Sequence, residues 1–202
     1  MDVTLFTNLA GAVGLGAASG LNPWIPLLGL GVAERTGAVE LSSSFHWLGA
    51  TSTLIVLGAL FVTDLIGDKV PAVDSVLHLF GLVVAPVSGA VVFAAQDNLV
   101  SNSHPVLAGV FGVALAGSVH TARGALRPAV TATTGGIGNP IVSALEDVAS
   151  AVVTVLAVVV PVIALLAVVG LTVWAVLTFR RWRRKRRRND SAGASAGQAR
   201  TS

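Results

Sequence analysis

The chain has 202 residues, of which 53% are apolar, 11% are charged and 5% are aromatic, and its mean hydropathy is +0.80. Water-soluble domains carry about 25% charged residues, so this composition excludes an ordinary soluble domain and indicates an integral membrane protein. Residues 1–179 hold 4 basic and 9 acidic side chains, whereas residues 180–202 hold 9 basic and 1 acidic. The chain has no cysteine, which excludes disulfides, thiolate metal sites and cysteine nucleophiles.

Six windows contain no Asp, Glu, Lys or Arg, namely 3–33, 41–63, 75–96, 98–122, 128–145 and 148–179. About 20 apolar residues are needed to cross the hydrocarbon core as a helix. The windows are continuously apolar and do not alternate, which favours helices over an outer-membrane barrel. Four ordinary spans are predicted, at about 45–64, 75–96, 105–121 and 155–179.

The first window is too long for one span and too short for two. Its middle reads Ser-Gly-Leu-Asn-Pro at residues 19–23. We therefore predict a helix, a break at residues 20–23 and a shorter helix that ends near Glu34. The last window is also long, and Pro161 inside it predicts a kink or an interfacial first segment.

A basic run follows Phe179, beginning at Arg180 and ending at Arg188, with eight basic residues in nine positions. Such a run stays on the cytoplasmic side, so we predict a stop-transfer anchor with a cytoplasmic C-terminus in the inner or plasma membrane. Binding of anionic lipid is a further reading of the run, and we expect no nucleic-acid partner. Residues 189–202 are predicted to be disordered. The N-terminus has no basic region typical of a removed signal peptide, and its side of the membrane stays open.

Two breaks share a local pattern that indicates a weak internal repeat. Asn22-Pro23 follows Ser-Gly-Leu, and Asn139-Pro140 follows Gly-Gly-Ile-Gly. Asn is a preferred N-cap and Pro suits the first helical position, so each pair predicts a helix start. Because irregular backbone is not tolerated against lipid, both breaks should be enclosed by protein or line a wet cavity. Interrupted segments at corresponding positions in two halves are typical of transporter sites, although Gly-rich helices also allow close packing alone.

The remaining charges form clusters that favour pairing, because charge inside a bilayer is costly. Asp64 and Asp68 lie four residues apart and precede Lys69 and Asp74, while His120, Arg123 and Arg127 end the fourth predicted span and Glu146-Asp147 precedes the last. One interpretation is a structural ion-pair network of Asp64, Asp68, Lys69, Asp74 and Asp147.

Two functional interpretations compete with the structural one. In the first, Arg123 and Arg127 present guanidinium groups to a phosphate or carboxylate near the helix that starts at Pro140. In the second, Asp64, Asp68, Glu146 and Asp147 gather around a cation. Neither a nucleophile elbow nor a P-loop is present in the sequence. We expect no metal and no cofactor.

Several strings resemble a bacterial membrane family catalogued as domain of unknown function 4126. They are Gly-Leu-Asn at 20–22, Asp-Lys-Val-Pro-Ala-Val-Asp-Ser at 68–75, Pro-Val-Ser-Gly-Ala at 86–90, the spacing of His120, Arg123 and Arg127, and Ser143 with Glu-Asp-Val at 146–148. The resemblance covers about residues 5–179. It implies a compact helical membrane domain, supports Asp68, Lys69, Asp74, Arg127, Asn139 and Glu146 as important positions, and brings no substrate. Ala85 and residues 134–136 depart from the family, which often has an arginine and a Pro-Glu-Pro turn there.

Together these patterns predict an all-α polytopic bundle with five or six helical segments, at residues 1–179, and a basic tail at 180–202. The leading functional hypothesis is a small transporter, flippase-like or permeation protein whose site is formed by Asn22, Arg123, Arg127, Asn139 and Glu146. The alternative is a structural or interaction protein that packs against a membrane partner or a second copy of itself. An intramembrane enzyme ranks only third among the hypotheses, because the sequence shows no nucleophile-base pair.

Overall fold

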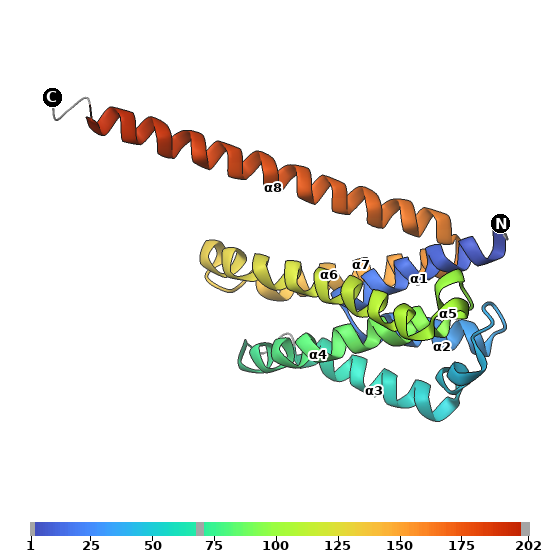
Figure 1. Ribbon diagram of the computed structural model, residues 1–202. Coiled ribbons are helices and arrows are strands. Elements are labelled where there is room, and N and C mark those ends of the chain that lie inside the picture. Colours follow the sequence, from blue (N-terminus) through green and yellow to red (C-terminus); the bar gives the residue numbers. More distant parts are fainter. Residues whose placement is uncertain (1–2, 68–70, 199–202) are drawn as a thin grey trace. The chain divides into compact units, whose positions relative to one another are not determined.

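The protein is described by a computed structural model that covers residues 3–67 and 71–198, with side chains described in those ranges except at 71–79, 99, 175, 179 and 182–198. These ranges are almost entirely helical (Figure 1), and the one extended contact in them is an isolated bridge between Leu41 and Gln96. The helices are α1 Val3–Leu21, α2 Trp24–Arg35, η1 Ser43–Gly49, α3 Thr51–Gly67, α4 Pro71–Ala95, α5 Leu99–Ser103, α6 Pro105–Thr134, α7 Asn139–Val159 and α8 Pro161–Gln198.

Several of these helices are long and apolar enough to span a membrane. Four meet that condition within the described ranges, namely Val3–Leu21, Pro105–Thr134, Asn139–Val159 and Pro161–Thr178, and a fifth is reached if the pair formed by η1 and α3, bent by 62°, counts as one span. The chain is therefore a multi-pass, all-α membrane protein, as its composition predicts.

Helix α1 lies at the centre of the bundle and packs against α4, α6 and α7. Ten residues of α1, all between Ala10 and Gly20, are buried, and most of them are Gly or Ala. Small residues let helix backbones approach closely. Lipid tails are as apolar as the side chains, so this close packing, and not the hydrophobic effect, drives helix association in a membrane. A Cβ on Gly20, for example, would lie 2.5 Å from the carbonyl oxygen of Ala116 in α6.

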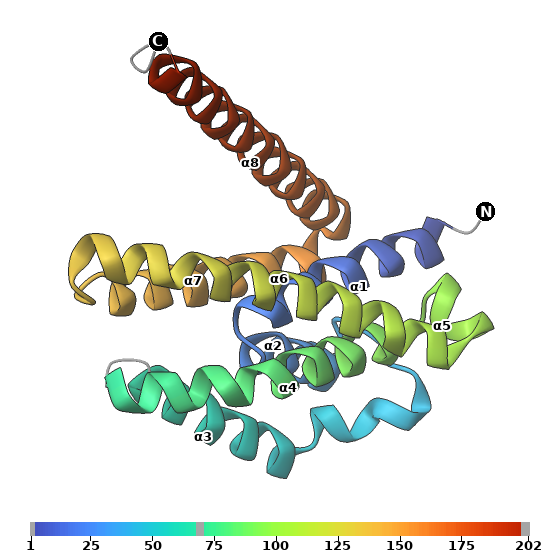
Figure 2. The ribbon, with the colours of Figure 1, turned by 60° about the vertical axis from the view of Figure 1, so that its left-hand side comes forward.

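Helices α4 and α6 run along each other, as Figures 1 and 2 both show. Their backbones touch where Gly89 of α4 meets Gly112 of α6, because a Cβ on either glycine would overlap the carbonyl oxygen of the other. Further along the same pair, the buried ring of His120 fills the space beside Gly81. This tight contact fixes the register of α6, which carries both arginines of the site.

The boundaries of two predicted spans differ from the structure. Helix α6 begins at Pro105 and continues through Pro128 to Thr134, so most of the window at 98–122 and the start of the next window form one helix. Helix α7 runs through Glu146 and Asp147 without interruption and ends at Val159. The predicted span at 155–179 is therefore divided: Val160 has non-helical dihedral angles and Pro161 begins a new helix, in agreement with the interruption predicted at Pro161.

By compactness the chain divides into a unit of residues 1–165 and a unit of residues 166–202. The first holds the core and every described site residue. Within the second unit, α8 continues as helix through the basic run to Gln198.

Candidate polar site at the α1–α2 break

The predicted break between α1 and α2 is present, and it is buried. The chain leaves the helix at Asn22, which is 2% exposed, and resumes it at Trp24. The side-chain oxygen of Asn22 accepts hydrogen bonds from the backbone N–H groups of Trp24, at 2.9 Å, and Ile25, at 3.3 Å. Asn22 therefore satisfies the first donors of α2, which would otherwise be left without partners.

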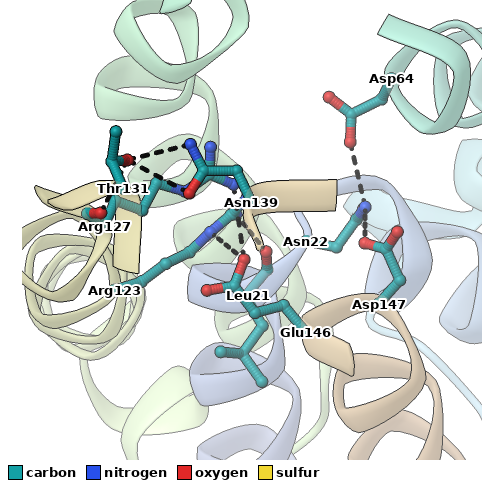
Figure 3. Close-up of polar contacts among 9 residues, drawn as sticks. All are labelled: Leu21, Asn22, Asp64, Arg123, Arg127, Thr131, Asn139, Glu146 and Asp147. Carbon is teal, nitrogen blue, oxygen red and sulfur yellow. Dashed lines mark hydrogen bonds and ion pairs between the residues drawn. The ribbon is translucent and has the colours of Figure 1, made fainter. Parts of the chain in front are cut away.

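The amide nitrogen of Asn22 makes the contacts that define the site. It donates to Oδ2 of Asp64 at 3.0 Å and to Oδ1 of Asp147 at 2.9 Å, as Figure 3 shows. The acceptors belong to α3 and α7, so one amide group joins three helices. Because its oxygen is held by α2, the amide cannot turn over, and its two N–H groups stay directed at the two carboxylates. We call these three residues the Asn22 triad.

The carbonyl groups at the end of α1 are satisfied by side chains from other helices. Ser150 of α7 donates to the carbonyl of Ala18 at 3.0 Å, and Ser88 of α4 donates to the carbonyl of Pro23 at 2.7 Å. The carbonyl of Leu21 accepts from Nη1 of Arg123 at 2.5 Å. A cation at a helix C-terminus also stabilises the helix dipole. An interrupted helix in an apolar bundle thus keeps its backbone groups paired, as lipid requires.

Arg123 and Arg127 meet Glu146 next to the Asn22 triad. Oε2 of Glu146 lies 2.6 Å from Nε of Arg123 and 3.5 Å from Nη2 of Arg127. The three side chains are only 12–14% exposed. A buried charge pair of this kind is stable only with good geometry, and loss of one partner leaves a charge in a poor solvent. Glu146 and Asp147 are neighbours in α7, so this helix connects the arginines to the triad.

Six of the predicted residues therefore converge: Asn22, Arg123, Arg127 and Glu146 from the predicted site, and Asp64 and Asp147 from the predicted ion-pair network. Arg123 and Arg127 contact Glu146, whereas the sequence hypothesis had them facing a bound anion near Pro140.

Asn139 lies outside this group. Its amide bonds to Oγ1 of Thr131 at 3.0 Å, and the hydroxyl of Thr131 also bonds to the carbonyl of Arg127 at 3.0 Å. Asn139 is the first residue of α7 and not its N-cap, which is Gly138. The helix start is as predicted, but its capping role is not.

The two breaks differ in their surroundings. Residues 135–138 form an exposed turn between α6 and α7, in which Gly135 and Gly136 have φ of 61° and 89°, left-handed values that favour glycine. Ile137 in this turn is 80% exposed. The expectation that both breaks are enclosed by protein therefore holds for Asn22 and is wrong for residues 135–138. The second break is a connection between helices, so the predicted symmetry of two half-sites is not found.

The structure does not describe the side chains of the other predicted network residues. Asp68 and Lys69 are outside the described residues, and Asp74 falls in α4 where side chains are not described. In the described part of the chain, His, Asp and Glu side chains form no group of three or more that could hold a metal ion. The cation-site interpretation therefore gains no support there.

Three buried serines at the break were missed by the sequence analysis. Ser19, Ser88 and Ser150 are each 2% exposed or less, and the hydroxyl oxygens of Ser88 and Ser19 lie 3.1 Å apart. Ser150 lies four residues after Glu146, on the same face of α7, which is a signal that could have identified it. Ser19 and Ser88 lie in strings that the sequence analysis quotes, at 19–23 and 86–90, but neither string by itself marks its serine as a partner of the break.

A second polar cluster fastens the far end of α2. Oε1 of Glu34 lies 2.5 Å from Nδ1 of His46, and Oε2 accepts from the N–H of Leu41 at 2.9 Å. Next to it, Arg35 donates to Oγ1 of Thr51 at 2.6 Å. These contacts tie α2 to η1 and to the start of α3. Trp47 nearby is half exposed, and tryptophan is enriched at membrane interfaces.

Residues 9–181 match a family model described as Domain of unknown function (DUF4126). The match covers every described residue of the site and confirms the resemblance carried by the sequence strings. Comparison with curated proteins and with solved structures gives no match.

Proposed function

The chain belongs to the family described as Domain of unknown function (DUF4126), and we propose that it is a small membrane transport protein that works at the α1–α2 break. The observation that carries the proposal is the Asn22 triad. One buried amide at an interrupted helix joins carboxylates from α3 and α7, beside a pair of arginines on α6. We further propose that the protein lies in the inner or plasma membrane with its C-terminus in the cytoplasm.

Two physical arguments support a transport role. Ionisable groups inside a membrane bundle are costly, and they commonly mark paths for ions or substrates. Interrupted helices supply the other element of such sites, because their ends expose backbone groups and dipoles inside the bundle. Both features occur here at one place, where α1 ends and α2 begins.

The contacts at the break also offer a way to couple motion to binding. Asp147 holds Asn22, while its neighbour Glu146 holds Arg123 and Arg127. A solute that competes for Asp64 or Asp147 would release Asn22, and a shift of α7 would at the same time disturb the arginine contacts. Binding and the packing of three helices are therefore linked through adjacent residues.

Transport can be tested in vesicles with purified protein. The probes are protons, followed with an entrapped pH dye, and fluorescent short-chain lipids with anionic, neutral or ammonium heads, followed by chemical quenching from outside. We expect at least one probe to move faster than in protein-free vesicles. Glu146→Gln should return the rate to that baseline, whereas Glu40→Gln, at an exposed position outside the site, should leave it unchanged. Equal rates with and without protein for all probes would contradict the proposal.

A structural or interaction role is the second candidate, and one observation favours it. The carbonyls of Ala18, Leu21 and Pro23 all have side-chain partners, so the break is also stable as a fixed joint. A stoichiometric membrane partner that co-purifies with the chain, together with no probe movement in vesicles, would establish this alternative. Glu146→Gln would then change partner binding or folding and nothing else.

A further inference from the structure

An apolar groove of about 520 Å³ lies between α2, α3 and α7. Its walls include Ile25, Leu28 and Val32 of α2, Phe61 of α3, and Val155 and Val158 of α7. Its volume is within the range of small-molecule sites, which bury most of a ligand against apolar walls.

The residues of the Asn22 triad do not line the groove themselves, but each lies close in sequence to a residue that does. On each helix, a groove residue lies one turn or less from a triad residue: Ile25 follows Asn22, Phe61 precedes Asp64, and Ala151 follows Asp147. Residues three or four apart share a helix face, so all three helices bring a polar group to the same end of the groove. The opposite end is formed by Ala33 and Val159, beside Glu34 and its interfacial cluster.

One wall of the groove holds a polar atom without a partner. Thr154 lines the groove and is 3% exposed, and its hydroxyl makes no hydrogen bond to any residue in the described ranges. Opposite it is Gly29, where any Cβ would overlap the methyl group of Thr154. The methyl group of Thr154 therefore packs directly against Gly29, and this contact joins α2 and α7 in the wall of the groove.

We propose that this groove binds the hydrocarbon tail of a cationic amphiphile, whose ammonium head lies at Asp64 and Asp147. Carboxylates accept hydrogen bonds from an ammonium group and repel an anionic head, so the triad selects the sign of the head group. Naming this amphiphile as the transported substrate rests on the proposed function, whereas its binding in the groove does not.

The dimensions agree with a molecule on its way across the membrane. From Asp147 to Val159, α7 rises about 18 Å. That length is more than half of a hydrocarbon core of about 30 Å. An amphiphile with its head at the triad and its tail directed toward Val159 would therefore extend over more than half of that thickness.

The test uses the full chain in lipid nanodiscs and a long-chain alkylammonium that carries a diazirine at the end of its tail. An alcohol and a sulfate of the same chain length serve as matched probes. After illumination, labelled residues are located by mass spectrometry. We expect the ammonium probe to label groove residues about tenfold more than either matched probe, a ratio that corresponds to a modest difference in affinity.

Two variants of α7 test whether the groove is the binding site. Val155→Trp fills the groove, while Val152→Trp places the same side chain at a position that is similarly exposed but does not line it. We expect labelling of the groove to be lost in Val155→Trp and retained in Val152→Trp. Asp64→Asn should abolish the preference for ammonium over alcohol while leaving labelling by the alcohol unchanged.

Each contrary result overturns the inference. Equal labelling by all three probes would mean that the triad does not choose the head group. Crosslinks from the groove to α8 or to a second copy of the chain, in place of lipid labelling, would identify a protein occupant. If ammonium labelling has the expected pattern but Glu146→Gln leaves all probe movement unchanged, the proposed function fails while the binding site stands.

Discussion

Asn22 and Asp147 are 125 positions apart in the sequence, yet Nδ2 of the first lies 2.9 Å from Oδ1 of the second. Figure 3 shows this contact beside the bond from Asn22 to Asp64. The same amide caps α2 with its oxygen. One side chain therefore both starts a helix and fastens that helix to two others.

Asn22→Ala should lower the free energy of unfolding by about 2 kcal/mol, because it removes the cap of α2 and the donor shared by two carboxylates. Thermal unfolding of the purified protein in detergent measures the change. Asn102→Ala, at an exposed position, is the matched control and should have little effect. Equal stability of the two variants would show that the buried amide is not needed to hold the break.

Arg123 and Glu146 should behave as a coupled pair. Each single variant, Arg123→Gln or Glu146→Gln, leaves a buried charge without its partner, so the double variant should be less destabilised than the two single effects added together. The expected interaction free energy is about 0.5–3 kcal/mol. A thermodynamic cycle over the four proteins measures it. Strict additivity would mean that the 2.6 Å contact contributes nothing to stability.

Gly112 and Gly109 are three residues apart in α6 and should respond oppositely to alanine. A Cβ on Gly112 would overlap the backbone of Gly89, whereas a Cβ on Gly109 would meet nothing within 4 Å. Gly112→Ala should therefore destabilise the protein by about 1–3 kcal/mol. Gly109→Ala should be neutral or stabilising by up to about 1 kcal/mol, since alanine favours helix. The same unfolding assay compares them, and a neutral Gly112→Ala would contradict the close approach of α4 and α6.

The C-terminal side of the membrane can be determined with one cysteine. Because the chain has none, Ser202→Cys creates a single reactive thiol. The basic run before it predicts a cytoplasmic location, so a membrane-impermeant maleimide should label this thiol only after the cells are opened. Labelling of intact cells would reverse the predicted orientation.

The same basic run should retain anionic lipid. Replacing Arg183, Arg184, Lys185 and Arg186 with Gln removes about 1 kcal/mol of attraction per residue. Native mass spectrometry of the purified protein should then show fewer bound anionic lipids, while the number of bound zwitterionic lipids stays the same. An unchanged anionic lipid content would leave the run with its anchoring role alone.

Long-range contacts explain where sequence reasoning failed. The Asn-Pro pairs at 22 and 139 predict helix starts, and both starts occur, because capping and proline geometry act within a few residues. The same local pattern does not specify burial, so the break at Asn22 is enclosed while the turn at 135–138 is exposed. Pro128 also shows the limit of local preference: proline is disfavoured inside a helix, and α6 nevertheless continues through it.

By itself, the sequence determined the membrane class, the position of the first break and the charged residues that had to find partners. These depend on composition and on interactions between near neighbours. The tertiary structure decided which charges meet: it joined Asp64 and Asp147 through Asn22, paired Glu146 with the arginines of α6, and brought Ser88 and Ser150 to the carbonyls of the break. Such pairings depend on how helices pack along their whole length, through contacts such as that of Gly89 with Gly112, and no local pattern encodes them.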